Sequence, residues 1–89
     1  MGFDEGSAKP IAYGVTFERA AAAFFDPFLR VVDAGRNDEA RDALIGYDGS
    51  GQMLFVIHVE IVHPKSDEEA IRIISARKAT LKEREHYDT

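Results

Sequence analysis

Apolar and polar positions alternate along the chain in a pattern that predicts a helix, several strands and a second helix. Apolar residues recur at helical spacing over residues 16–25, where Thr16 is a suitable N-cap and Pro27 stops the helix. Short apolar segments between turn signals predict strands, at residues 29–33, 43–47, 53–62 and 70–76. The Asp-Gly-Ser-Gly stretch at 48–51 predicts a hairpin turn, because glycine supplies the positive φ that such turns need.

A second helix is predicted at residues 81–88, because Thr80 and Glu83 form a capping box at its start. Residues 1–14 show no clear period and predict no more than a short turn or helix. The predicted fold class is α+β, with a small antiparallel sheet of about four strands flanked by an N-terminal helix and a short C-terminal helix. With 89 residues, the chain can bury one modest core, so we expect a single domain over residues 1–89.

The strand at 53–62 carries the clearest information about which side chains face the core. Alternation places an all-apolar set on one side of this strand, namely Met53, Phe55, Ile57, Val59 and Ile61. We expect that side to meet the core, so that His58 and Glu60 lie next to each other on the opposite face. The same alternation places Arg72 and Arg77 of the last strand on opposite faces. The helical pattern predicts three phenylalanines in the core, Phe17, Phe24 and Phe28.

Charge is distributed unevenly along this acidic chain. The formal net charge is −5, yet residues 70–89 carry five basic and three acidic side chains. This distribution indicates either a solvated helix face of mixed charge or a small anion-binding patch on an acidic body. The absence of cysteine excludes disulfides and thiolate zinc sites. No apolar run reaches the roughly 18 residues of a membrane span, so we expect a soluble cytoplasmic protein that does not contact membranes.

His58 beside Glu60 is a candidate general base, because the carboxylate would fix the tautomer and orientation of the imidazole. A nearby arginine would bind a phosphate through two hydrogen bonds and stabilise charge on its oxygens. This combination suits phosphodiester transfer in which a ribose 2′-hydroxyl attacks the adjacent phosphate. The alternative is a purely structural pair of opposite charges across two strands. The three histidines are scattered, so we expect no metal site, and no cofactor is predicted.

The start of the last helix is a second candidate for anion binding. Arg77 and Lys78 stand where a strand leads into this helix, and basic side chains there would strengthen an anion site. Tyr87 lies on the same side of the helix as Thr80. Its ring can stack on a nucleic-acid base, or it can simply cover the edge of the sheet.

The C-terminal segment also resembles the signature of a known family. Residues 71–80 are Ile-Arg-Ile-Ile-Ser-Ala-Arg-Lys-Ala-Thr, followed by Glu83, Arg84 and Tyr87. Further matches lie upstream, at Gly14, Val15, Phe17, Ala20, Phe25, Asp26, Pro27, Glu39, Arg41, Ile45, Gly46 and His58. Together these positions resemble the BrnT toxin family, the toxin halves of type II toxin–antitoxin modules, over about residues 13–88.

The resemblance implies a RelE-like fold and a ribonuclease that inhibits translation and is neutralised by an antitoxin encoded beside it. RNA is then the substrate, and DNA contact belongs to the antitoxin partner. The positions that match the family's RNA-cleaving pattern are Arg72, Arg77, Lys78 and Tyr87, with Glu39 and Arg41 as weaker matches. Family members typically carry Lys-His-Gly-Val where residues 12–15 are Ala-Tyr-Gly-Val. Tyr13 can donate a proton or stack there, but it is no base near neutral pH.

The leading hypothesis is a toxin-like endoribonuclease that needs no metal and uses the 2′-hydroxyl of RNA. Arg72 and Arg77, presented together toward solvent, would hold the scissile phosphate. His58 or Glu60 would accept the proton, and Tyr87 would position the base. Further RNA contacts are expected from Lys78, Arg41 and Tyr13. The alternative is a catalytically weak or inactive toxin homologue that acts as a protein-interaction module through its acidic body, and a homo-oligomer is left open.

Overall fold

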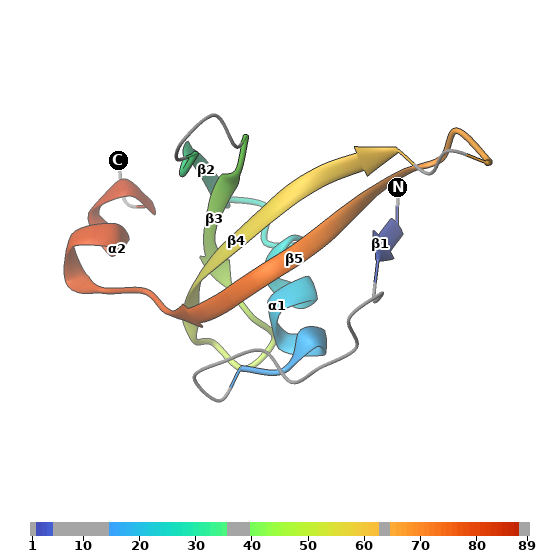
Figure 1. Cartoon of the computed structure of the whole chain (residues 1–89). Helices are drawn as coiled ribbons and strands as arrows, with labels where there is room; N and C mark the ends of the chain where they lie inside the picture. Colours follow the sequence, from blue (N-terminus) through green and yellow to red (C-terminus); the bar gives the residue numbers. More distant parts are fainter. Residues whose placement is uncertain (1, 5–14, 36–39, 63–64, 88–89) are drawn as a thin grey trace.

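One mixed sheet and two short helices make up the fold, in a computed structural model that describes residues 2–4, 15–35, 40–62 and 65–87. In chain order the elements are β1 (Gly2–Asp4), α1 (Phe17–Ala23), β2 (Arg30–Asp33), β3 (Asp42–Tyr47), β4 (Met53–Val62), β5 (Glu69–Lys78) and α2 (Leu81–Tyr87) (Figure 1). The strand order is β1-β5-β4-β3-β2. Strands β2 to β5 are antiparallel, which confirms the predicted α+β class with four antiparallel strands and two helices.

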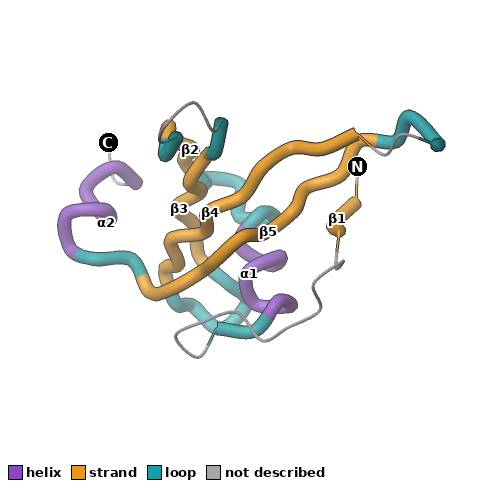
Figure 2. Tube along the Cα trace, in the orientation of Figure 1, coloured by secondary structure: helices purple, strands orange, loops and turns teal. Residues whose placement is uncertain are grey.

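Strand β1 is an addition that the sequence pattern did not predict. It pairs in parallel with the start of β5, with Gly2, Phe3 and Asp4 opposite Ala70, Ile71 and Arg72 (Figure 2). We expected a turn or helix somewhere in residues 1–14, and three residues are too few to show the alternation that marks a strand. Most of that segment lies outside the described residues.

Local sequence signals set the starts of both helices as predicted. The Thr16 hydroxyl accepts a hydrogen bond from the Arg19 amide at 3.2 Å and caps α1. The capping box of α2 is complete: the Thr80 hydroxyl accepts from the Glu83 amide at 3.2 Å, and Glu83 Oε1 accepts from the Thr80 amide at 2.8 Å. Each helix has only 7 residues, so tertiary contacts must hold it in place. Neither described helix has the length and apolar character needed to cross a membrane.

The turn between β3 and β4 is built around a buried carboxylate. Asp48 Oδ1 accepts from the Ser50 amide and hydroxyl and from the Gln52 amide, at 2.7 to 3.0 Å. Its Oδ2 accepts from Nε of Arg19 at 2.9 Å, which ties α1 to the turn. Gly51 has a φ of +88°, as the predicted hairpin turn requires.

Helix α1 covers one face of the sheet, which we call the helix face (Figure 1). Ala20 and Ala23 are fully buried in one cluster with Leu44, Leu54 and Val56. These small alanines let the helix lie close to the strands.

The close approach of α1 also depends on a glycine in β3. A Cβ atom at Gly46 would lie 2.9 Å from the carbonyl oxygen of Ala23. A larger residue would therefore push α1 away from the sheet.

The expectation that the all-apolar side of β4 meets the core is wrong for every residue of that side except Met53, which is buried. Leu54, Val56 and His58 are buried on the helix face, whereas Phe55 and Ile57 on the other side are only half-buried. The reason is that α1 supplies the apolar partner on the helix face, and the β4–β5 hairpin extends past it (Figure 1). Alternation alone could not show where the helix would pack.

The predicted burial of the phenylalanines is confirmed only in part. Phe17 and Phe24 are half-buried, but Phe28 is 73% exposed. Helix α1 ends at Ala23, so the helical spacing that placed Phe28 on the buried side does not reach it.

A β-bulge in β5 decides which of its side chains share a face. Ile57 of β4 pairs with Ser75, and the next residue, His58, pairs with Ile73. Ile74 is therefore the extra residue of the bulge, and the alternation of β5 shifts by one position there.

The bulge places both arginines of β5 on one face of the sheet. Arg77 lies opposite Phe55 and Arg72 lies opposite Val59. Directly opposed residues of antiparallel strands point to the same face, and Phe55 and Val59 are on the side away from α1. We call this side the groove face. The predicted separation of Arg72 from Arg77 is wrong, because strict alternation does not allow for a bulge.

Candidate functional site

A groove of about 560 Å³ opens on the groove face between α2 and the loop that joins β2 to β3. It is lined by Asp33, Ala34, Gly35, Arg41, Phe55, Ile57, Arg77 and Glu83. Two guanidinium groups thus share one concavity with an aromatic ring and with two carboxylates, Asp33 and Glu83. Such a lining suits a ligand that combines an anionic group with a flat apolar surface.

Three contacts fix the guanidinium of Arg77 at this groove. Its Cζ lies 4.5 Å from the centroid of the Phe55 ring. Its Nη1 and Nη2 donate to Oε1 and Oε2 of Glu83 at 2.8 and 2.7 Å, and Nη1 also donates to the Lys78 carbonyl oxygen at 3.3 Å. The Arg77 side chain is 36% exposed, so it still reaches solvent. This bidentate salt bridge to the Glu83 carboxylate holds the guanidinium in one orientation.

Glu83 links the cap of α2 to this arginine. Partial burial acts to raise the pKa of Glu83, but hydrogen bonds from Arg77 and from the Thr80 amide, with attraction to the guanidinium, hold it below its usual value. The carboxylate is therefore ionised near neutral pH. The sequence predicted the cap but missed this ion pair, because the pairing depends on how the strand leads into the helix.

The other predicted arginines also lie on this side of the molecule. Arg41 lines the groove from the β2–β3 loop. Arg72 is exposed on the groove face, beyond the groove and further along the β4–β5 hairpin. The structure thus brings Arg41 and Arg77 into one concavity and keeps Arg72 on the same face.

Three of the predicted site residues lie away from the groove. His58 is 4% exposed, packs edge-on against the Phe24 ring with centroids 4.9 Å apart, and places Nδ1 3.3 Å from the Val56 carbonyl oxygen. The expectation that His58 faces away from the core is therefore wrong. Glu60 is exposed on the helix face, and the register of β5 places Lys78 on that face too.

Tyr87 lies in a joint between α2 and the end of α1. Its hydroxyl donates to Asp26 Oδ2 at 2.8 Å, and its ring packs edge-on against Tyr47 with centroids 5.2 Å apart. Asp26 also accepts from the amides of Phe28 and Tyr47, at 2.9 and 2.8 Å. Burial acts to raise the pKa of Asp26, but these hydrogen bonds together lower it. These contacts hold the Tyr87 side chain between α2, Asp26 and Tyr47.

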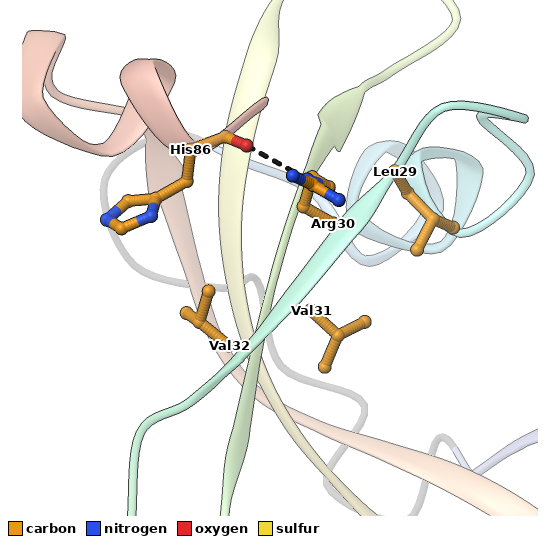
Figure 3. Close-up of a pocket in the computed structure, with 5 residues that line it drawn as sticks. All are labelled: Leu29, Arg30, Val31, Val32 and His86. Carbon is orange, nitrogen blue, oxygen red and sulfur yellow. Dashed lines mark hydrogen bonds between the residues drawn. The ribbon is translucent and has the colours of Figure 1, made fainter. Parts of the chain in front are cut away.

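A second contact fixes the C-terminal end of α2 against the edge of the sheet. Nε of Arg30 donates to the His86 carbonyl oxygen at 3.0 Å, beside a shallow pocket that Leu29, Val31 and Val32 help to line (Figure 3). Together with the Arg77–Glu83 pair, this contact anchors α2 at both ends. No residue of α2, which the structure describes from Leu81 to Tyr87, is buried. These two side-chain contacts therefore position α2 beside the groove.

Two predicted residues, Tyr13 and Glu39, lie outside the described residues. Within the part of the chain that the structure describes, no three histidine or carboxylate side chains come together in a group that could hold a metal ion. Sequence reasoning also missed Phe55 as part of the groove, since alternation had assigned it to the core.

Comparison with known families identifies the family of the chain. Residues 4–83 match the family described as "Ribonuclease toxin, BrnT, of type II toxin-antitoxin system". The chain belongs to the BrnT family. Membership confirms the resemblance seen in the sequence, indicates a ribonuclease toxin of a type II toxin–antitoxin system, and implies an antitoxin partner. The matched range contains every residue that lines the groove, whereas Tyr87 lies outside the matched range.

A search of curated proteins found no match to the chain.

Proposed function

We propose that this chain is a metal-independent endoribonuclease of RelE-like fold whose groove binds the scissile phosphate of RNA. The observation that carries the proposal is the guanidinium of Arg77, held over the Phe55 ring in the same groove as Arg41. Two cations and an aromatic ring match a nucleotide, which joins a phosphate to a planar base.

In the proposed reaction the 2′-hydroxyl oxygen of a ribose attacks the adjacent phosphorus, and the bond from phosphorus to the 5′-oxygen breaks. The hydroxyl proton ends on the leaving 5′-oxygen, so the products are a 2′,3′-cyclic phosphate and a 5′-hydroxyl. Negative charge grows on the non-bridging oxygens in the transition state, and Arg41 and Arg77 stabilise it. A guanidinium carries five N–H donors, so Arg77 can bridge Glu83 and a phosphate at once.

These roles differ from the sequence hypothesis at the phosphate, at the base and in proton transfer. We assign charge stabilisation to Arg41 and Arg77 and base stacking to Phe55. We assign no proton transfer to His58 or Glu60, because neither lines the groove.

We propose further that RNA cleavage inhibits translation in the cytoplasm and that a cognate DNA-binding antitoxin, encoded beside the toxin, neutralises the chain. Family membership supports this setting. The acidic body also supports it, since residues 1–69 carry thirteen acidic and six basic side chains and would attract a basic partner segment.

The proposal is tested by incubating the purified chain with RNA in the presence of EDTA and analysing the ends of the products. Wild-type protein is expected to produce 2′,3′-cyclic phosphates, and Arg77→Ala is expected to cleave about 100- to 1,000-fold more slowly. Lys82→Ala, which removes one exposed positive charge from α2, serves as the matched control. Intact RNA together with tight antitoxin binding would favour the alternative, a toxin homologue that acts only as a protein-interaction module.

A further inference from the structure

We infer that Arg72 forms a second phosphate-binding subsite, so that an RNA strand runs along β5 from the groove toward Arg72. The subsite rests on the proposed RNA-cleaving function and extends it to nucleotides beyond the scissile phosphate. It changes the role of Arg72 from holding the reacting phosphate to holding the strand.

The bulge in β5 allows one RNA strand to reach both arginines. Five positions separate Arg72 from Arg77, and strict alternation would put them on opposite faces. The extra residue Ile74 restores both to the groove face, where they lie opposite Val59 and Phe55. Bulges of this kind re-aim side chains near functional sites.

The spacing of the two arginines points to different phosphates. Phe55 and Val59 are four positions apart on β4. At about 3.3 Å per residue, this corresponds to about 13 Å along the sheet. The guanidinium of Arg77 is held over Phe55 and by Glu83, so it does not extend toward Arg72. One nucleic-acid strand in a duplex carries a phosphate about every 3.4 Å of axis, so the gap spans more than one nucleotide.

The charges along the hairpin favour the same path. Both acidic residues of β4 and β5, Glu60 and Glu69, lie on the helix face, opposite Ile71 and Val62 respectively. Between the two arginines the groove face of these strands presents neutral side chains such as Ser75. A phosphate backbone along this path would meet a guanidinium at each end and no carboxylate of β4 or β5 between them. Each end also has an acidic residue from another element, because Glu83 pairs with Arg77 and Asp4 of β1 is the register partner of Arg72.

The subsite predicts that the effect of Arg72 depends on the length of the RNA. Two probes of mixed sequence suit the test, a dinucleotide and a dodecamer, both carrying 2′-O-methyl groups that prevent 2′-hydroxyl attack. Binding of the dinucleotide is followed by NMR titration and that of the dodecamer by fluorescence anisotropy. Thermal melting of each variant checks that it is folded.

Arg72→Ala is expected to weaken dodecamer binding about five- to tenfold, because one charge-assisted phosphate contact is lost. It should also reduce the salt dependence of log K by about 0.7, the value for one phosphate on a single strand. Dinucleotide binding should stay within about twofold of wild type, because one phosphate cannot reach both arginines. Arg77→Ala should weaken both probes, Arg72→Lys should retain most of the dodecamer affinity, and Lys82→Ala should change neither.

Equal weakening of both probes by Arg72→Ala would place Arg72 at the scissile phosphate and overturn the subsite. An unchanged dodecamer affinity, or the same loss in Lys82→Ala, would also overturn it. The proposed function fails separately if wild-type protein binds the dodecamer but leaves cleavable RNA intact. Absence of dodecamer binding by wild-type protein would overturn both.

Discussion

Replacing Glu83 by Gln should lower the stability of the fold but strengthen RNA binding. This carboxylate supports α2 and also neutralises the charge of Arg77. Glu83 accepts two hydrogen bonds from Arg77, at 2.8 and 2.7 Å, and one from the Thr80 amide at 2.8 Å. Gln keeps one oxygen for the Thr80 amide, so the helix cap survives. Gln has no negative charge and only one acceptor oxygen, so the bidentate salt bridge with Arg77 is broken.

The expected loss of stability follows from the exposure of the pair. The side chains of Arg77 and Glu83 are 36% and 19% exposed, so solvent screens part of their attraction. Exposed ion pairs contribute about 0.2–1 kcal/mol to stability, and hydrogen bonds to charged groups about 1.5–3 kcal/mol. Because this pair is partly exposed, we expect the free energy of unfolding to fall by about 1 kcal/mol, near the top of the first range. For a domain of this size, we expect the melting temperature to fall by roughly 4–8 °C.

RNA affinity should change in the opposite direction. If a bound phosphate lay about 7 Å from Glu83, removing the negative charge would relieve about 0.6 kcal/mol of repulsion at the dielectric constant of water. That corresponds to binding about threefold tighter. Melting by circular dichroism and titration with a 2′-O-methyl dodecamer measure the two effects on the same sample.

Glu85→Gln is the matched control, because Glu85 is exposed on the same helix and the substitution removes the same charge. It should leave the melting temperature unchanged. Two results for Glu83→Gln would refute the reasoning: an unchanged melting temperature, or RNA binding weakened tenfold, which would mean that the ion pair is needed to present Arg77.

Three further predictions concern residues that hold the helices and the β3–β4 turn in place. Tyr87→Phe should cost about 1 kcal/mol in urea unfolding, because Asp26 loses one hydrogen bond; a selective loss of RNA cleavage at unchanged stability would assign Tyr87 to catalysis instead. Gly46→Ala should destabilise by about 1–3 kcal/mol, because its Cβ would lie 2.9 Å from the Ala23 carbonyl oxygen. Burial acts to raise the pKa of Asp48, but hydrogen bonds lower it to about 2, so its stabilisation should be lost as pH falls from about 4 toward 2. Asp48→Asn should flatten that part of an acid-unfolding series, and an unchanged acid slope would contradict this assignment.

The fold could be predicted from local signals where those signals are strong. The strand at Met53–Val62 has the predicted bounds, and the hairpin turn and both helix starts follow from glycine and capping residues. These features depend on a few neighbouring residues, so one sequence is enough to show them.

The orientation of the sheet could not be predicted in the same way. An all-apolar side of β4 suggested the core, yet His58 is buried and Phe55 lies at the groove. Which face is buried depends on where α1 packs, and the alanines of α1 together with Gly46 permit that packing on the side of His58.

The candidate site was only partly accessible from sequence. Arg77 was identified from its place before the last helix and Arg41 through the family resemblance, and the structure places both in one groove. The bulge at Ile74 has no sequence signal, so strict alternation contradicted the hypothesis that Arg72 and Arg77 are presented together, and only the register of β5 shows their common face. Both the helix pattern and the resemblance named Tyr87 as a site residue, but only the structure shows its hydrogen bond to Asp26.

The most direct test of the groove is an NMR titration of the ¹⁵N-labelled chain with the 2′-O-methyl dodecamer. The account predicts chemical-shift changes at the Arg77 side chain and at the amides of Arg41, Phe55 and Ile57, with smaller changes at the amides of α1. Changes concentrated on α1 and the helix face, with the Arg77 signals unmoved, would contradict it.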